Sequence, residues 1–111
     1  MKITPNFTNI FEIRMGSPFN CCELSLSGNW VPELPKEGWQ DKFAHDPSGR
    51  YLALILWDNS ENSNPGFCVV VIDSKEKKVE KKQRIEGCCK LIEWNKLCFS
   101  VNAFHSIKVT I

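Results

Sequence analysis

The sequence predicts an all-β protein built as an antiparallel meander, and three observations lead to that class. Two strongly apolar runs, residues 50–58 and 67–73, are rich in β-branched and aromatic residues, and each ends in Asp. Turn signals separate the apolar runs, the clearest being Asp46-Pro47-Ser48-Gly49. The intervals are too short for helical crossovers, so neighbouring strands are expected to be antiparallel. We expect eight or nine strands and no long helix.

The first elements are expected to be two half-buried strands and a loop. Apolar and polar residues alternate over residues 10–15 and again over residues 22–27. A turn around Gly16-Ser17-Pro18 joins the two. Residues 28–39 then contain two prolines and the glycines at both ends of the stretch, together with two tryptophans, which predicts a structured loop rather than a strand.

The two apolar runs are predicted to be central strands. Residues 50–58 and 67–73 are so continuously apolar that both of their faces should be covered. The polar stretch between them, residues 59–66, is predicted to be a solvated and flexible linker.

The last third of the sequence predicts four more strands. Residues 78–85 alternate weakly and carry many lysines, which is typical of an edge strand protected against aberrant pairing. A helix over those residues is the alternative, because Glu and Lys favour helix. Residues 88–94, 97–101 and 104–110 complete the predicted sheet as antiparallel neighbours.

Length and composition indicate one globular domain over residues 1–111. A chain of this length that is 42% hydrophobic and 11% aromatic has enough apolar area for one modest core and needs no cofactor to fold. A net charge of only +1 disfavours binding to nucleic acid or to an anionic membrane. The N-terminal residues lack a secretory apolar run, and no 18 apolar residues follow one another, so a cytoplasmic location is expected.

The six cysteines are interpreted as reduced core residues. They contain no Cys-x-x-Cys pair and no histidine at zinc-finger spacing, and adjacent cysteines on a strand point to opposite faces. No metal site is therefore predicted. Inward-pointing side chains are expected for Cys22, Cys68, Cys89 and Cys98.

No catalytic motif emerges from the sequence. His45 beside Asp46, together with His105 and Lys90, could be assembled into a general acid–base pair. Their spacing gives no support for that assembly, and phosphate-binding loops, nucleophile elbows and metalloprotease motifs are absent. We expect a protein that is not an enzyme, with a small histidine-dependent hydrolase as an alternative.

Partner binding is the function that the residues favour. Tryptophan supplies rigid amphipathic contact area, and neighbouring carboxylates can meet the cationic groups of a partner. The candidate contact residues are Trp30, Glu33, Glu37, Trp39, Asp41, Asp58 and Glu61. The competing interpretation is that both tryptophans fold inward over the core. Residues 75–84 are expected to form a solvated Lys-rich face, with docking of an acidic protein as their alternative use.

Residues 43–85 and then 88–111 resemble, in degenerate form, two successive blades of a WD40-like β-propeller. A Gly-containing turn precedes the first strand of the unit, and a strand ending in Ile72-Asp73 precedes the next hairpin. The resemblance implies half of a propeller or an open sandwich. A closed ring requires at least about four blades, so some sheet edge should stay available to a partner.

In size and style the chain also resembles bacterial immunity proteins of contact-dependent growth inhibition. That resemblance implies a non-enzymatic protein that neutralises a toxin domain, a nuclease among the expected targets, by covering its active site or substrate path. The carboxylates would imitate phosphates in a basic cleft, with Trp30 or Trp39 as the anchor. A homodimeric β-scaffold or subunit is the alternative, with exposed strands paired across a two-fold axis.

Overall fold

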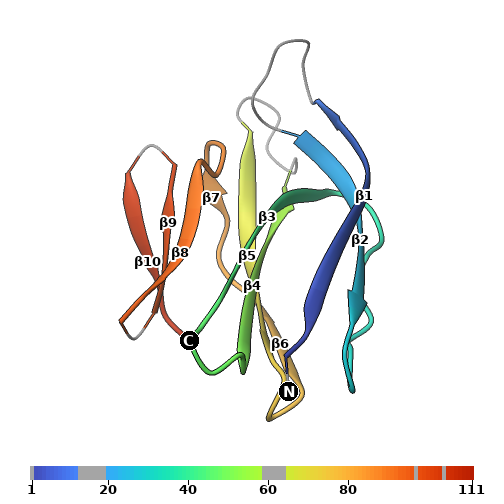
Figure 1. Ribbon diagram of the computed structural model, residues 1–111. Helices are drawn as coiled ribbons and strands as arrows, with labels where there is room; N and C mark the ends of the chain where they lie inside the picture. Colours follow the sequence, from blue (N-terminus) through green and yellow to red (C-terminus); the bar gives the residue numbers. More distant parts are fainter. Residues whose placement is uncertain (1, 13–19, 59–64, 97, 104) are drawn as a thin grey trace.

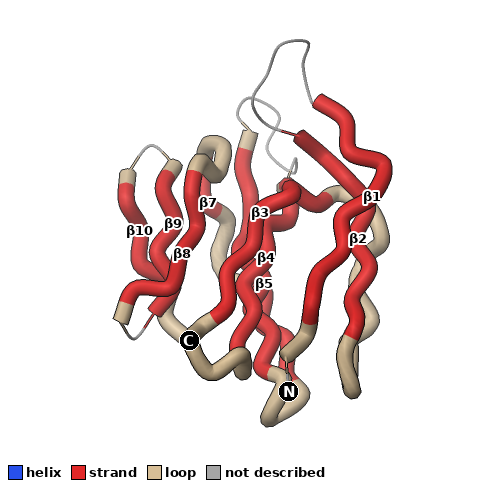
Figure 2. Tube along the Cα trace, viewed as in Figure 1, coloured by secondary structure: helices blue, strands red, loops and turns tan. Residues whose placement is uncertain are grey.

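The computed structural model describes residues 2–12, 20–58, 65–96, 98–103 and 105–111. Within these residues the chain forms ten β-strands and no helix (Figures 1 and 2), which confirms the all-β class and exceeds the expected strand number by one or two. The strands are β1 (Thr4–Glu12), β2 (Asn20–Ser27), β3 (Trp39–His45), β4 (Tyr51–Trp57), β5 (Gly66–Asp73), β6 (Lys78–Lys81), β7 (Ile85–Glu86), β8 (Leu91–Asn95), β9 (Cys98–Asn102) and β10 (Ser106–Val109).

The strands form two open antiparallel sheets. The larger sheet follows the order β1-β2-β3-β4-β5-β6, and β7 pairs with β5 beyond the end of β6. The smaller sheet has the order β10-β9-β8. Consecutive strands lie next to each other, so the predicted antiparallel meander is confirmed. Neither sheet closes on itself, and terminal strands such as β1 and β10 retain an open edge within the described residues.

The strands are arranged in three layers, with β3, β4 and β5 in the middle (Figure 1). The hairpin β1–β2 covers one face of the middle layer, and the sheet β8–β10 covers the other. Alternation along β4 explains this arrangement, because Ala53 and Ile55 point to the small sheet while Leu52 and Leu54 point to the hairpin. The prediction that both faces of the central strands are covered is therefore confirmed.

Each interface between layers holds one apolar cluster. Between the middle layer and the small sheet, Phe67 and Phe99 are fully buried, and Trp94 packs edge-on against Phe99 with ring centroids 5.1 Å apart. Between the middle layer and the hairpin, Trp39 and Ile72 are fully buried. Burial of each such side chain contributes about 1.5–3 kcal/mol. Both clusters depend on the same two strands, β4 and β5.

A buried amide joins the middle layer to the small sheet. Gln40 is only 1% exposed, and its Nε2 donates a hydrogen bond of 2.8 Å to the carbonyl of Cys89, just before β8. A buried side-chain amide requires such a partner, because an unpaired donor away from water costs free energy. The bond fixes where the chain enters the small sheet.

Two predicted elements have different boundaries in the structure. The first strand begins at Thr4 instead of at residue 10, because the pairing of Thr4–Thr8 with β2 compensates for their weak apolar alternation. The turn predicted at residues 16–18 lies outside the described residues. Residues 78–85 form an edge strand, as predicted, but in two pieces, since β6 ends at Lys81 and β7 begins at Ile85.

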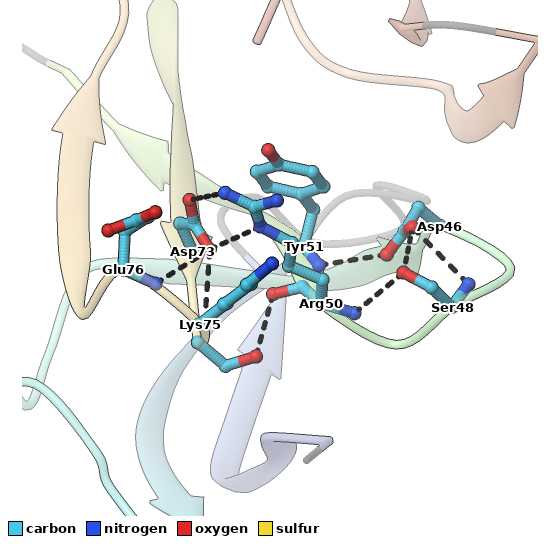
Figure 3. A network of polar contacts seen from close by, with 8 residues as sticks. Asp46, Ser48, Arg50, Tyr51, Asp73, Lys75 and Glu76 are labelled. Atoms are coloured by element: carbon cyan, nitrogen blue, oxygen red, sulfur yellow. Dashed lines mark hydrogen bonds and ion pairs between the residues drawn. The ribbon is translucent and has the colours of Figure 1, made fainter.

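The turn before β4 is held by the side chain of Asp46 (Figure 3). Its Oδ1 accepts a hydrogen bond of 2.8 Å from the main-chain N–H of Tyr51, and its Oδ2 accepts one from the hydroxyl of Ser48. Gly49 has a φ of 79°, a left-handed conformation that other residues rarely adopt. The predicted Asp-Pro-Ser-Gly turn is thus confirmed.

The same network ties β4 to the end of β5. Arg50 donates two hydrogen bonds of 2.8 Å to the two carboxylate oxygens of Asp73, and its guanidinium lies 4.8 Å from the centre of the Tyr51 ring (Figure 3). The main-chain N–H groups of Lys75 and Glu76 also donate to Asp73, at 3.0 and 3.2 Å. Hydrogen bonds from Arg50 lower the pKa of Asp73 to about 2. The carboxylate therefore acts as a structural clamp between two turns.

Candidate protein-binding surface

The structure separates the two tryptophans that the sequence put forward as anchors. Trp39 begins β3 and is 0% exposed, and its Nε1 donates a hydrogen bond of 2.7 Å to the carbonyl of Pro35. The side chain belongs to the core and stabilises the loop in front of it, so Trp39 offers no contact area to a partner. This position agrees with the competing interpretation, in which Trp39 folds inward over the core.

The side chain of Trp30 is partly buried. It packs partly against the cluster under the β1–β2 hairpin and lines a small cavity of about 130 Å³. Lys2 and Lys77 line the same cavity. Trp30 is therefore accompanied by basic side chains and not by the carboxylates that were expected beside it.

A β-bulge in β1 creates an apolar surface that the sequence analysis did not identify. Thr8 pairs with Glu23 and Phe11 pairs with Cys21, so Asn9 and Ile10 together lie opposite a single residue of β2. Asn9 adopts a φ of 51°, in the left-handed region that Asn tolerates best after Gly. The extra residue moves the Phe11 side chain to the outer face of the hairpin, where it is 60% exposed.

The exposed Phe11 forms one wall of the acidic groove, our name for the hollow of about 450 Å³ lined by Asn9, Phe11, Cys21, Cys22, Glu23, Glu37 and Gly38. The loop before β3 supplies Glu37 and Gly38, and the main-chain N–H of Trp57 fixes that loop with a hydrogen bond of 2.8 Å to the carbonyl of Gly38. The groove is therefore built from the β1–β2 hairpin on one side and an anchored loop on the other.

Carboxylates surround this groove. A hydrogen bond from Asn9 and the nearby Lys36 lower the pKa of Glu23, and Lys36 Nζ lies 3.4 Å from a Glu23 oxygen. Asp41 is exposed, and its charge lies close enough to add to the effect of burial in raising the pKa of Cys22 to about 11. Two acidic side chains, Glu23 and Glu37, thus line the groove, while Asp41 lines a separate hollow with Lys42. A cationic partner surface would find complementary charge here.

The remaining predicted contact residues lie apart from the groove lining. Glu33 is exposed on the loop between β2 and β3. Asp58 is half-buried at the end of β4, where its carboxylate lies 3.9 Å from Arg84 and accepts a hydrogen bond from the Cys68 thiol. Glu61 lies outside the described residues. The structure therefore brings Glu37 together with Glu23, leaves Asp41 outside the groove lining, and places Asp58 among partners of its own.

The two histidines lie in different parts of the fold, His45 in the larger sheet and His105 in a turn of the smaller one. His45 on β3 has its Nε2 2.7 Å from the carbonyl oxygen of Ile3, and its ring stands edge-on to Phe43. His105 is exposed in the turn between β9 and β10. No group of three or more His, Cys, Asp or Glu side chains suited to a metal ion occurs in the part of the chain that the structure describes.

Neither a protein-family model nor a curated protein nor a solved structure matches this chain. Among the described residues there is also no helix with the length and apolarity needed to cross a bilayer.

Proposed function

We propose that the protein is a non-enzymatic protein-binding protein and that the acidic groove is its contact surface. The observation that carries this proposal is the juxtaposition of an exposed aromatic ring, Phe11, with the carboxylates of Glu23 and Glu37 in the groove lining. A large apolar side chain at the centre of a contact excludes water and slows dissociation, while surrounding charge speeds association. In this proposal Phe11 takes the anchoring role that the sequence analysis gave to Trp30 or Trp39.

The partner that fits best is a protein with a basic cleft. A nuclease domain has such a cleft because it binds phosphates, and the carboxylates of the groove supply negative charge that complements it. This agrees with the resemblance to bacterial immunity proteins, and we propose neutralisation of a toxin domain in the cytoplasm as the function. The propeller-blade resemblance stays a prediction.

Growth rescue tests this proposal. The proposal predicts that a toxin domain is encoded beside the gene for this chain. The chain is co-expressed with that domain, and the affinity of the two purified proteins is measured by calorimetry. We expect rescue by the wild type, and Phe11→Ser should weaken binding by about tenfold to a hundredfold, as for a central aromatic anchor. Val31→Ser is the matched control, since Val31 is a 41% exposed apolar residue that does not line the groove.

Two results would contradict the proposal. The first is undiminished affinity of the double variant Phe11→Ser, Glu37→Lys. The second is a complex that forms equally well in high salt, because charge complementarity predicts weaker association when the carboxylates are screened.

A homodimeric scaffold is the second candidate, and the open edges of β1 and β10 favour it. Sedimentation analysis distinguishes the two functions. A tight dimer that shows no affinity for the co-encoded toxin domain supports the scaffold, whereas a monomer that binds the toxin domain supports the acidic groove.

A further inference from the structure

A second groove lies on the small sheet, on a part of the molecule that the proposed function does not use. It has a volume of about 300 Å³ and runs between β10 and residues 82–85. Four consecutive residues, 107–110, line one wall, and four consecutive residues, 82–85, line the other. Consecutive residues of a strand point alternately to opposite faces, so a wall made of all four is a main-chain edge and not a sheet face.

The main chain along the β10 wall is open to a guest. β10 is the terminal strand of its sheet and pairs only with β9 among the described strands. On the opposite wall, the main-chain N–H of Lys82 donates a hydrogen bond of 2.8 Å to the carbonyl of Val69, and Ile85 pairs with Phe67, so this wall is held to β5. A terminal edge such as that of β10 offers unpaired N–H and C=O groups to an extended segment.

The side chains around this groove select the charge of a guest. Ile85, Ile107 and Val109 provide apolar contact, and Lys82, Arg84 and Lys108 provide positive charge. Lys82 and Arg84 already contact Glu80 and Asp58, at 2.9 and 3.9 Å. Lys108 is exposed, and no ion pair to it occurs within the described residues. The charge left over on this edge is therefore positive.

We propose that β10 receives an extended, acidic segment of another protein as a fourth strand of the small sheet. Glutamate or aspartate on the guest lies beside Lys108, and apolar guest residues on the opposite face meet Ile107 and Val109. Cross-strand pairs of opposite charge stabilise such an addition, whereas like charges destabilise it. Pairing of β10 with β10 of a second copy brings the two Lys108 side chains onto one strand pair, so the charge favours an acidic guest over self-association.

The test uses a fluorescent synthetic peptide in which valine and glutamate alternate, with binding to the full chain followed by fluorescence anisotropy. We expect saturable binding that weakens as salt is added. Lys108→Glu should reduce the affinity by about threefold to thirtyfold, because a favourable cross-strand pair becomes a repulsive one. Lys90→Glu is the control, since Lys90 is also exposed and lies outside the groove.

A second peptide examines the main-chain pairing. Methylation of alternate peptide nitrogens removes donors without changing the side chains, and we expect it to abolish binding because strand addition depends on main-chain hydrogen bonds. Equal binding of the methylated peptide, or full affinity of Lys108→Glu, would overturn the proposal. So would a dimer in sedimentation analysis that forms more tightly in a mixture of wild type and Lys108→Glu than in either protein alone, because opposite charges would then meet across a β10–β10 pair. Phe11→Ser leaves this peptide binding unchanged, so failure here and failure of the acidic groove are separate results.

Discussion

Replacement of Asp73 by Asn removes the charge that clamps the turns at the ends of β4 and β5. The wild-type carboxylate accepts two hydrogen bonds from Arg50 and two from the main chain of Lys75 and Glu76. An amide in the same place has one acceptor oxygen, so at least one of the Arg50 bonds is lost. We expect Asp73→Asn to fold with lower stability at neutral pH.

The size of the effect follows from the pKa of Asp73. The difference between about 2 in the folded protein and the ordinary value of 3.8 corresponds to about 2.4 kcal/mol, at about 1.36 kcal/mol per pKa unit. The Arg50 side chain is 32% exposed, and solvent screening reduces this to roughly 1–2 kcal/mol. Because the folded pKa is lowered, the stabilisation is complete above about pH 4 and is lost as the pH falls through about 2.

Urea unfolding followed by tryptophan fluorescence measures this difference, since the fully buried Trp39 reports on the core. The curves are recorded for wild type and Asp73→Asn at neutral pH and at a series of lower values. Glu76→Gln is the control, because that side chain is exposed and should change stability by less than about 0.5 kcal/mol. Equal stability of Asp73→Asn and wild type at neutral pH, or a difference that persists unchanged at about pH 2, would refute the reasoning.

Three further predictions concern the buried thiols, the core and the turn before β4. Burial raises the pKa of Cys22 and Cys89 to about 11, so alkylation at mildly alkaline pH, read by mass spectrometry, should modify the half-buried Cys21, Cys88 and Cys98 before these two. Faster modification of Cys22 or Cys89 would contradict their burial. Phe99→Ala should lower the free energy of unfolding by about 3–5 kcal/mol, since the ring is fully buried between two layers, and a loss below about 1 kcal/mol in urea unfolding would argue against that packing. Gly49→Ala should cost about 1 kcal/mol in the same assay because of the positive φ, and an unchanged midpoint would rule out the left-handed turn.

The central part of the fold was predictable from local pattern. Residues 51–57 and 66–73 are apolar at odd and even positions alike, so apolar side chains point to both faces of each strand. Only a strand covered on both faces explains such a run. The Asp46 turn was equally predictable, because each of its residues favours one place in a turn. In these segments the residues that determine the local structure are close neighbours in the sequence.

The acidic groove was not predictable in the same way. It depends on the bulge at Asn9 and Ile10, and a bulge is defined by the register against the partner strand and not by its own sequence. Ordinary alternation places Phe11 on the same face as Phe7, in the core. The burial of Trp39 was equally unpredictable, because an amphipathic indole in a proline-containing loop fits both the core and the surface. Its position is determined only when β2 and β4 pack around it.

The sharing of β4 and β5 by both apolar clusters has a consequence during translation. The ribosome releases β1 and β2 before the middle layer, so one face of the emerging middle layer is covered at once. The other face, with Ile55, Phe67 and Val69, stays bare until residues 91–109 have left the exit tunnel. An interrupted or truncated polypeptide therefore exposes an apolar sheet face that promotes aggregation. Its fate in the cell depends on chaperones rather than on its own folding equilibrium.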